Sequence, residues 1–396
     1  MSEFAPADTQ TLVEIVATAL AHEEPLELVG GGSKRGLGRP PQAAHTLSLA
    51  GFAGIRDYEP AELVLTAGAA TPLDEIERVL TERRQMLAFE PGDWRALLGS
   101  SGQRQTIGGA IACNLAGPRR IRQGAARDHL LGFAGVSGRG EAFKAGGKVV
   151  KNVTGYDLCK LMAGSYGTLA ALTEVAVKVL PLPASVATVA VLGLNVERAV
   201  AAMTQGLNAS HELSGAAHMP AGVGAERAMT ILRVEGPAPS VVARASALQA
   251  ELKSFGAIEI LRDKESVPLW NAVRDAAPFA AEQSRAVWRV SVAPQAAPAL
   301  LAILGRALDA QYFLDWGGGL VWLAVKGAAD GGASAIRAAL PPDGGHATLI
   351  RGSASLRASV PVFQPLAPGV AALSARVKDG FDPKRILNRG RLYAEI

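Results

Sequence analysis

Two glycine-rich turns lie within one stretch of the chain, residues 106–183, and they constrain the fold more than any other feature. Glycine has no Cβ, so the backbone N–H groups at such turns can approach a ligand closely. Thr106 is a suitable N-cap, which predicts a helix whose first turn holds Gly108 and Gly109 with unpaired amides. Unpaired amides at a helix N-terminus suit a pyrophosphate. The second turn contains Gly164, Ser165, Gly167 and Thr168, and an alternating pattern after it predicts a strand over 169–179. We interpret the stretch as a clamp for a nucleotide cofactor.

The composition is that of an ordinary globular protein. The 396 residues suffice for two domains, and 49% are apolar while 19% are charged. A net charge of +4, without a basic run or an aromatic platform, gives no reason to expect a nucleic-acid partner. We expect no secretory signal at the N-terminus and no transmembrane segment. The sequence therefore predicts a cytoplasmic protein, at most peripheral to the inner membrane through partner subunits.

Cysteine and histidine usage argues against a metal centre. Cys113 and Cys159 are the only cysteines, whereas an iron–sulfur cluster generally needs four thiolates. A disulfide is not expected in a reducing compartment, so both are interpreted as reduced, buried residues. The six histidines show no paired ligand spacing, and no metal site is predicted.

The first part of the chain reads as short strands mixed with helices. Apolar spacing predicts a helix over 8–21, and a strand over 27–29 runs directly into GGGSKRGLGRP at 30–40. That glycine segment is either a phosphate loop or a flexible surface loop, and the residues alone leave both open. It is not the dinucleotide fingerprint, because no helix pattern follows, and it lacks the P-loop pattern.

A second set of signals continues this α+β arrangement. A strand is predicted over 63–68, and Thr71 followed by Pro72 predicts a helix with Thr71 as N-cap and Pro72 as first residue. A further strand is expected over 86–89. Short strands in this order are unlike the regular βαβ repeat of a doubly wound fold.

After Pro181 and Pro183 the pattern changes to strands alternating with alanine-rich helices. Strands are predicted over 187–194, 229–234, 288–292 and 320–325, and helices over 196–205, 240–254 and 296–308. This pattern indicates a second α+β domain, an antiparallel sheet covered by helices, and shows no solenoid repeat.

Seven motifs, taken together, resemble the vanillyl-alcohol-oxidase or PCMH type of FAD-linked oxidases. They are GGGSK at 30–34, PGDW at 91–94, TIGGAIACNLAGPRR at 106–120, RDHLLG at 127–132, KNVTGYDLCKLMAGSYGTL at 151–169, DWGG at 315–318 and FDPKRILN at 381–388. Three sequences within these motifs, GPRR at 117–120, KNVTGYDL at 151–158 and DWGG, most resemble the FAD-binding subunits of bacterial glycolate oxidases. The resemblance implies a PCMH-type FAD-binding domain of two α+β subdomains at 1–183 and a cap domain at 184–362. It also implies a C-terminal segment at 363–396 that returns to the FAD domain.

The resemblance also implies which residues hold FAD. One wall of the pyrophosphate site would be Gly30, Gly31, Gly32, Ser33 and Lys34, and the other Thr106, Ile107, Gly108 and Gly109. Cys113 and Asn114 would lie near the flavin ring. Gly164, Ser165, Gly167 and Thr168 would lie near the adenosine, and the strand from Leu169 would offer main-chain hydrogen bonds. FAD is expected to be non-covalent because GGGSK has no His, with Cys113 as the alternative anchor.

Oxidation of a 2-hydroxy acid needs a hydride acceptor, which a flavin supplies, a base, and a cation for the carboxylate. Candidate carboxylate clamps are Arg119, Arg120 and Arg122, which could equally form a solvated basic face or pair with FAD phosphates. His346 is a candidate base, or a structural histidine. Groups interpreted as ring-positioning or structural are Lys151, Tyr156 and Asp157.

One motif of the catalytic relatives is missing. They carry H-x-G-D-G-N-x-H in the cap domain, whereas this chain has PPDGGHAT at 341–348. Without two imidazoles at that spacing a divalent cation has no ready site to polarise the substrate.

The resemblance thus implies a chain that binds FAD within a glycolate oxidase oxidising glycolate to glyoxylate. Oxidation would take place mainly on a homologous FAD-linked subunit, with an iron–sulfur subunit receiving the electrons. Two alternatives remain open. One is a stand-alone FAD oxidase or dehydrogenase of another 2-hydroxy acid or alcohol. The other is a non-catalytic assembly subunit with a decayed flavin site, against which the intact glycine turns argue.

Overall fold

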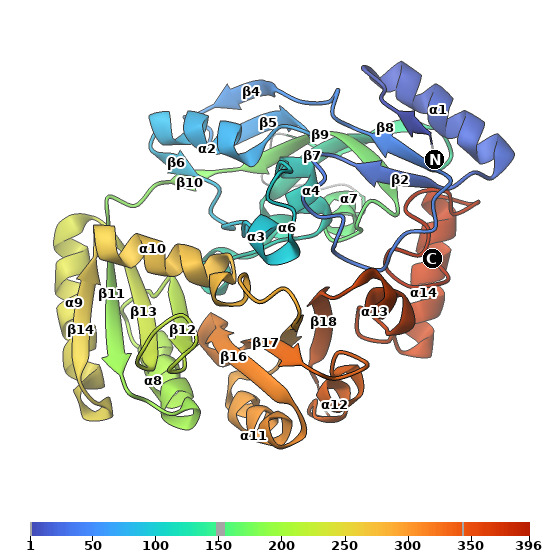
Figure 1. Cartoon of the computed structure of the whole chain (residues 1–396). Coiled ribbons are helices and arrows are strands. Elements are labelled where there is room, and N and C mark those ends of the chain that lie inside the picture. The colour runs from blue at the N-terminus through green and yellow to red at the C-terminus, as the bar shows by residue number, and fades with distance from the viewer. Residues whose placement is uncertain (1, 148–154, 343) are drawn as a thin grey trace.

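The structure is a computed structural model that describes residues 2–147, 155–342 and 344–396 (Figure 1). We call the part from β1 to β10 the N-terminal lobe and the part from β11 to β18 the second lobe. The two lobes lie one above the other in Figure 1, and the C-terminal helix α14 runs alongside the N-terminal lobe near α1. No helix of the described ranges is both long enough and apolar enough to cross a lipid bilayer.

A small parallel sheet opens the N-terminal lobe. Its strands, in the order β1-β3-β2, are β1 (Glu3–Phe4), β3 (His45–Ser48) and β2 (Leu26–Val29). Helix α1 (Thr9–His22) packs on it through Leu12 and Val16, and Asp8 caps the helix by accepting a 2.8 Å hydrogen bond from the N–H of Thr11. The predicted helix and strand of this region are confirmed to within a residue or two.

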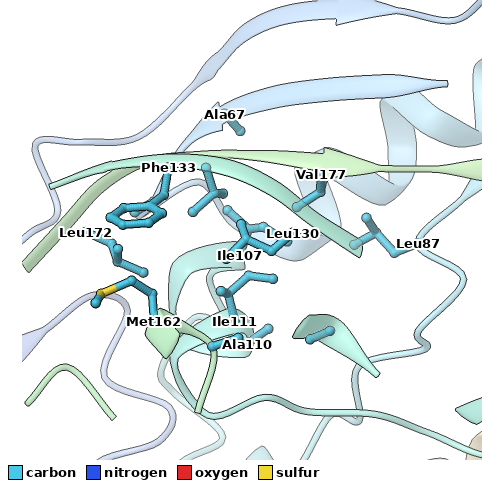
Figure 2. Close-up of a cluster of buried hydrophobic side chains, with 14 of the residues drawn as sticks. Ala67, Leu87, Ile107, Ala110, Ile111, Leu130, Phe133, Met162, Leu172 and Val177 are labelled. Carbon is cyan, nitrogen blue, oxygen red and sulfur yellow. The ribbon is translucent and has the colours of Figure 1, made fainter. Parts of the chain in front are cut away.

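A five-stranded antiparallel sheet forms the rest of this lobe. Its strands, in the order β4-β5-β9-β7-β8, are β4 (Ile55–Glu59), β5 (Val64–Gly68), β9 (Ala170–Lys178), β7 (Leu130–Ser137) and β8 (Ala142–Gly146). The short elements around it are α2 (Leu73–Glu82), β6 (Gln85–Met86), α3 (Arg95–Leu98), α4 (Ile107–Ala112), α5 (Arg120–Gln123), α6 (Ala126–His129), α7 (Leu158–Met162) and β10 (Leu180–Pro181). Figure 2 shows Ile107 and Ile111 of α4 and Met162 of α7 packed together beneath Phe133 and Val177 of the sheet. The glycine-rich helix α4 is therefore fixed by its apolar residues.

Two local predictions in this lobe are wrong. Helix α2 begins at Leu73 with Pro72 at the N-cap, because the Thr71 hydroxyl is bonded to the Gly68 carbonyl at 2.7 Å instead of capping. The strand expected over 86–89 ends at Met86. A turn closes there, since the N–H of Glu90 donates to the Leu87 carbonyl at 3.1 Å.

The second lobe contains one eight-stranded antiparallel sheet, in the order β14-β11-β13-β12-β16-β17-β15-β18. Its first half comprises β11 (Ser185–Leu192), α8 (Val196–Asn208), β12 (Gly215–Met219), β13 (Met229–Gly236), α9 (Ala238–Leu252) and β14 (Ile258–Arg262). Its second half comprises β15 (Ala286–Ser291), α11 (Ala297–Ala307), β16 (Asp309–Asp315), β17 (Leu320–Lys326), α12 (Ala333–Ala338) and β18 (His346–Arg351). Each half is a βαββαβ unit of ferredoxin-like order. The predicted antiparallel sheet covered by helices is confirmed.

Helices α8, α9, α11 and α12 cover one face of this sheet, and α10 (Asp263–Arg274) and the N-terminal lobe cover the other. Trp94, from the segment before α3, packs edge-on against Trp322 of β17 at 5.4 Å between ring centroids. The two lobes thus share a buried aromatic contact. The predicted boundaries of residues 1–183, 184–362 and 363–396 stay a prediction, although β10 ends at Pro181 and β11 begins at Ser185.

The C-terminal segment, with α13 (Ala354–Ser359) and α14 (Pro368–Phe381), returns to the N-terminal lobe. The N–H of Leu26 in β2 donates to the Ile386 carbonyl at 2.7 Å. Lys378 is buried, and its ammonium donates to Asp382 at 2.6 Å and to the Thr168 carbonyl at 2.6 Å. Both ends of the chain therefore build the same lobe.

Candidate functional site

A cavity of about 760 Å³ opens in the N-terminal lobe where β2, α4, β9 and the C-terminal tail meet. Ten of the predicted cofactor residues line it: Gly30, Gly31, Gly32, Ser33, Lys34, Thr106, Gly108, Gly109, Cys113 and Gly167. The structure thus brings together segments from three distant parts of the sequence. The segment over 30–34 forms a wall of this cavity. This position argues against the second interpretation of that segment, a flexible surface loop.

The other predicted cofactor residues do not line the cavity. They are Ile107, Asn114, Gly164, Ser165, Thr168 and Leu169. Ile107 and Leu169 belong to the hydrophobic core. The Ser165 carbonyl accepts hydrogen bonds from the N–H and the hydroxyl of Thr168 at 3.0 and 2.7 Å. This turn presents Tyr166 and Gly167, which do line the cavity, so these residues support the site from behind it.

The hydrogen-bond donors of the cavity differ from those predicted. Thr106 is the N-cap of α4, as expected, and its hydroxyl accepts the N–H of Gly109 at 3.2 Å. The N–H of Gly108 donates to the Ala69 carbonyl at 2.8 Å. Both amides are therefore occupied, and the prediction that they are unpaired is wrong.

Free amides lie instead in the loop over 30–34, which adjoins Thr106. Within the ranges that the structure describes, the N–H groups of Gly31, Gly32 and Lys34 donate to no protein acceptor. A Cβ on Gly31 would lie 2.1 Å from the Arg104 carbonyl oxygen, so only glycine allows this close approach of the two loops. The loop over 30–34 supplies the donors for an anion.

Two cations that face the cavity are poorly neutralised: Lys34 forms no ion pair among the described residues, and Arg391 has only a long one. The Lys34 ammonium donates to the Gln105 side chain at 2.9 Å, and burial lowers the pKa of Lys34 to about 8. Arg391 has a buried Nη1 without a hydrogen-bond partner, 3.9 Å from Glu27, and burial lowers its pKa as well. One unpaired and one weakly paired positive charge beside free amides fit a ligand with a diphosphate.

Cys113 and Tyr166 also line the cavity. Burial raises the pKa of the Cys113 thiol and of the Tyr166 hydroxyl, so both are neutral at neutral pH. The Tyr166 ring packs edge-on against Phe363 at 5.1 Å. Neutral side chains of this kind can pack against an aromatic ring system.

Two of the three predicted carboxylate clamps already have carboxylate partners. Arg119 is largely buried and pairs with Glu90 at 2.9 Å and Glu235 at 2.6 Å. Arg122 is exposed and pairs with Glu212 at 2.8 Å. Neither guanidinium is free for a substrate, and a catalytic role for either stays a prediction.

The remaining candidates lie in different places. Arg120 stacks on the Trp316 ring, with 4.7 Å from its guanidinium carbon to the ring centroid. His346 begins β18 and is partly exposed. Its partial burial and the charges of Arg289 and Arg120 lower its pKa, so it is neutral at neutral pH. Tyr156 is 92% exposed and Asp157 caps α7, while Lys151 lies outside the described residues. No group of three or more potential metal ligands occurs in the ranges the structure describes.

Sequence reasoning missed three residues of this region: Asn388, Arg391 and Arg289. The Asn388 side chain accepts the N–H of Leu28 at 2.8 Å and donates to the Tyr166 carbonyl at 2.7 Å, so it ties two walls of the cavity together. Asn388 closes the FDPKRILN motif and Arg391 follows three residues later, so the motif was the available signal. Arg289 lies within an ordinary strand pattern that gave none.

Known proteins similar to this chain include FAD-binding proteins. The FAD binding domain family matches residues 3–146. Over 388 residues the chain is 34% identical to the glycolate oxidase subunit GlcE of Escherichia coli (strain K12), covering 98% of each. It is 31% identical over 196 residues to the glycolate oxidase subunit GlcD of Bacillus subtilis (strain 168), covering 49% of this chain and 40% of that one.

Solved structures show the same fold at low sequence identity. The 4-ethylphenol oxidase from Gulosibacter chungangensis has a TM-score of 0.73 at 12% identity, covering 99% of this chain and 89% of its own. An alkyldihydroxyacetonephosphate synthase has a TM-score of 0.69 at 16% identity, covering 98% and 75%. The chain therefore belongs to the PCMH-type family of FAD-linked oxidases, and within it to the group of the glycolate oxidase subunit GlcE.

Proposed function

We propose that this chain is the FAD-binding subunit of a glycolate oxidase complex, in which glycolate is oxidised to glyoxylate and the electrons pass to partner subunits. One observation carries the proposal. A cavity with free amides, the unpaired cation of Lys34 and the weakly paired cation of Arg391 lies in a chain that matches GlcE of Escherichia coli over 98% of both lengths. Bound FAD supplies a two-electron acceptor for such a reaction.

The chain's own residues would hold FAD at three places. The amides of Gly31 and Gly32, with Lys34 and Arg391, would bind the diphosphate. The part of the cavity near Cys113 and Tyr166 would take the flavin ring. FAD would be held by these non-covalent contacts, since no histidine lies in the loop over 30–34.

The division of labour follows from what the sequence lacks. Two cysteines cannot ligate an iron–sulfur cluster, so a partner subunit would carry the electrons onward. The cap lacks the two-histidine motif of the catalytic relatives, so a homologous FAD-linked subunit would oxidise most of the glycolate. The complex would be cytoplasmic, or peripheral to the inner membrane through a partner.

The absorbance spectrum of the purified chain, before and after denaturation, tests the proposal. We expect flavin bands, and release of all the flavin into the supernatant on denaturation. Mixing with glycolate without oxygen should leave the flavin of the isolated chain oxidised for far longer than that of the complex. Rapid bleaching of the isolated chain would indicate a self-sufficient oxidase, and a colourless chain that cannot be reconstituted with FAD would indicate an assembly subunit.

A further inference from the structure

Arg289 is the most unusual charged side chain at the junction of the two lobes. It projects from β15 next to Trp322 of β17 and is surrounded by three indole rings. The guanidinium carbon lies 5.0 Å from the ring centroid of Trp316, 5.3 Å from that of Trp322 and 5.5 Å from that of Trp94. Trp94 comes from the N-terminal lobe, so both lobes build this cage.

The guanidinium has no anionic partner. Within residues 2–147, 155–342 and 344–396, Arg289 makes no ion pair and no side-chain hydrogen bond, and its Nε is buried without a partner. Two other arginines of the same sheet are fully engaged. Arg233 donates to Glu90 at 2.9 and 3.0 Å, and Arg351 donates to four carbonyl oxygens. An unpaired charge in such a place is costly unless a ligand neutralises it.

The nearest acid does not serve as a dedicated counter-ion. Asp315 is buried at the end of β16 and accepts the N–H of Trp316 at 2.7 Å, but lies outside ion-pair distance of Arg289. Burial raises the pKa of Asp315 to about 7, so its carboxyl is only partly ionised at neutral pH. Arg289 itself stays charged, because burial lowers its pKa only to about 10.

A second cation adds to the positive field. Arg120 stacks on Trp316, the same ring that Arg289 contacts, and likewise has no ion pair among the described residues. The charges of both arginines act on His346, whose strand position pairs with Ser291 of β15. Two guanidinium groups on one ring repel each other, and an anion between them would remove this cost.

This cage lies beside the cofactor cavity. Trp94, Trp316 and Trp322 share one hydrophobic cluster with Tyr166, which lines the cavity, and the charge of Arg289 acts on the Tyr166 hydroxyl. A guanidinium presents two parallel N–H groups that match a carboxylate, and the three indole rings restrict the ligand to a small one.

We propose that Arg289, assisted by Arg120, binds the carboxylate of a small 2-hydroxy or 2-keto acid at the lobe junction of this chain itself. The identity of the acid rests on the proposed function, but the presence of an anion site does not. The homologous subunit would then share substrate or product binding with this chain, even where this chain turns over slowly.

Tryptophan fluorescence tests the site directly, because three of the five tryptophans contact Arg289. The purified full chain is titrated with glycolate and with oxalate in low-salt buffer, and with glycolamide as the neutral analogue. We expect saturable changes with both acids and none with glycolamide. Arg289→Gln should weaken oxalate binding by about tenfold or more, and Arg289→Lys by less, because it keeps the charge but loses the planar pair of donors.

Arg227→Gln is the matched control, since Arg227 is an exposed arginine of the second lobe that pairs with Glu259 at 3.5 Å. It should bind oxalate like the wild type. The inference is overturned if no acid produces a saturable change, if Arg289→Gln binds oxalate like the wild type, or if phosphate binds as tightly as oxalate. FAD content is measured in the same samples: its absence would refute the proposed function and leave the titration to decide this site.

Discussion

At the scale of single residues, the buried cations of this protein fall into two groups. Arg233 and Lys378 form buried ion pairs, with Glu90 and Asp382, that connect distant segments or successive turns of the fold. Lys34 and Arg289, both partly buried, form no ion pair among the described residues, and Arg391 has only the 3.9 Å pair with Glu27. Because a poorly neutralised cation removed from water destabilises the fold, we infer that a bound anion would stabilise the chain at these places. The cofactor cavity holds two such residues and the lobe junction holds the third.

Lys34 gives the first of these places a pH dependence. Its pKa of about 8 in the folded chain is below its ordinary value of 10.5, so the unfolded chain holds more protons between these pH values. The stability of the FAD-free chain should therefore rise as pH increases from about 8 to 10.5. FAD affinity should change in the opposite direction and fall above pH 8, because the diphosphate favours the protonated ammonium.

Replacing Lys34 by Met should lower FAD affinity at pH 7 by about tenfold, the size of one hydrogen bond to a charged group. It should also abolish most of the fall in affinity between pH 7 and pH 9. Quenching of FAD fluorescence on binding measures both. Lys253→Met, at an exposed lysine of the second lobe, is the control. A variant at position 34 with the wild-type pH dependence would rule out Lys34 as the titrating group.

The residues predicted for the cavity and those missed differ in a physical way. The segments over 30–34 and 106–109 can be recognised in the sequence because their close backbone approach requires glycine. Arg391 and Arg289 have no such local signature, since the fold alone decides which of 40 basic residues lacks a partner. Sequence could therefore locate the walls of the site, with Lys34 among them, but not the cations Arg391 and Arg289.

At the scale of elements, α4 shows where local reasoning stops. The sequence correctly predicts its N-cap at Thr106, which depends on neighbouring residues only. The predicted free amide of Gly108 is taken by Ala69, at the end of β5, because that strand packs directly against the helix start. A cap can be recognised from sequence, whereas the tertiary partner of the capped amides cannot.

A second contact between elements joins the two lobes. Glu90, in the turn after β6, accepts two hydrogen bonds from Arg233 of β13 and pairs with Arg119. Arg119 in turn pairs with Glu235. Burial alone would raise the pKa of Glu90, but Arg233 and Arg119 outweigh it, and the pKa lies below its usual value. This network of two acids and two arginines is buried and balanced.

Glu90→Gln should destabilise the protein by about 3 kcal/mol, because it leaves Arg233 and Arg119 with one acid between them. Urea denaturation measures the free energy of unfolding. Glu212→Gln breaks the exposed pair with Arg122 and should cost about 1 kcal/mol or less. Equal effects of the two substitutions would show that the buried network contributes no more than a surface ion pair.

At the scale of the whole molecule, the N-terminal lobe is built from both ends of the chain. The fold class and the antiparallel second sheet were predictable, since strand and helix periodicities are local. The internal doubling of that sheet left no visible sequence repeat, because the two βαββαβ units share topology and not side chains. The return of the C-terminal tail to the N-terminal lobe was implied by resemblance alone. Its contacts in the structure join it to β2 and to the turn at Tyr166.

Asn388 is the point where that return reaches the cofactor cavity. Its side chain joins Leu28, on one wall, to Tyr166, on the other, and each of them lies more than 200 residues earlier in the sequence. Asn388→Ala removes both bonds without changing any charge, so it should cost about 2 kcal/mol of stability and loosen the walls. FAD affinity should fall severalfold, measured as retention of flavin on dialysis.

Lys384→Ala, which breaks an exposed pair with Glu23 in the same tail, should retain FAD like the wild type. Arg391→Met separates geometry from charge, because it removes a cation facing the cavity and keeps the two bonds of Asn388. If Asn388→Ala retained all its FAD while Arg391→Met lost it, the tail would act by charge alone. If both substitutions release FAD, the C-terminal tail shapes a site whose other walls come from residues 28–35, 106–113 and 166–172.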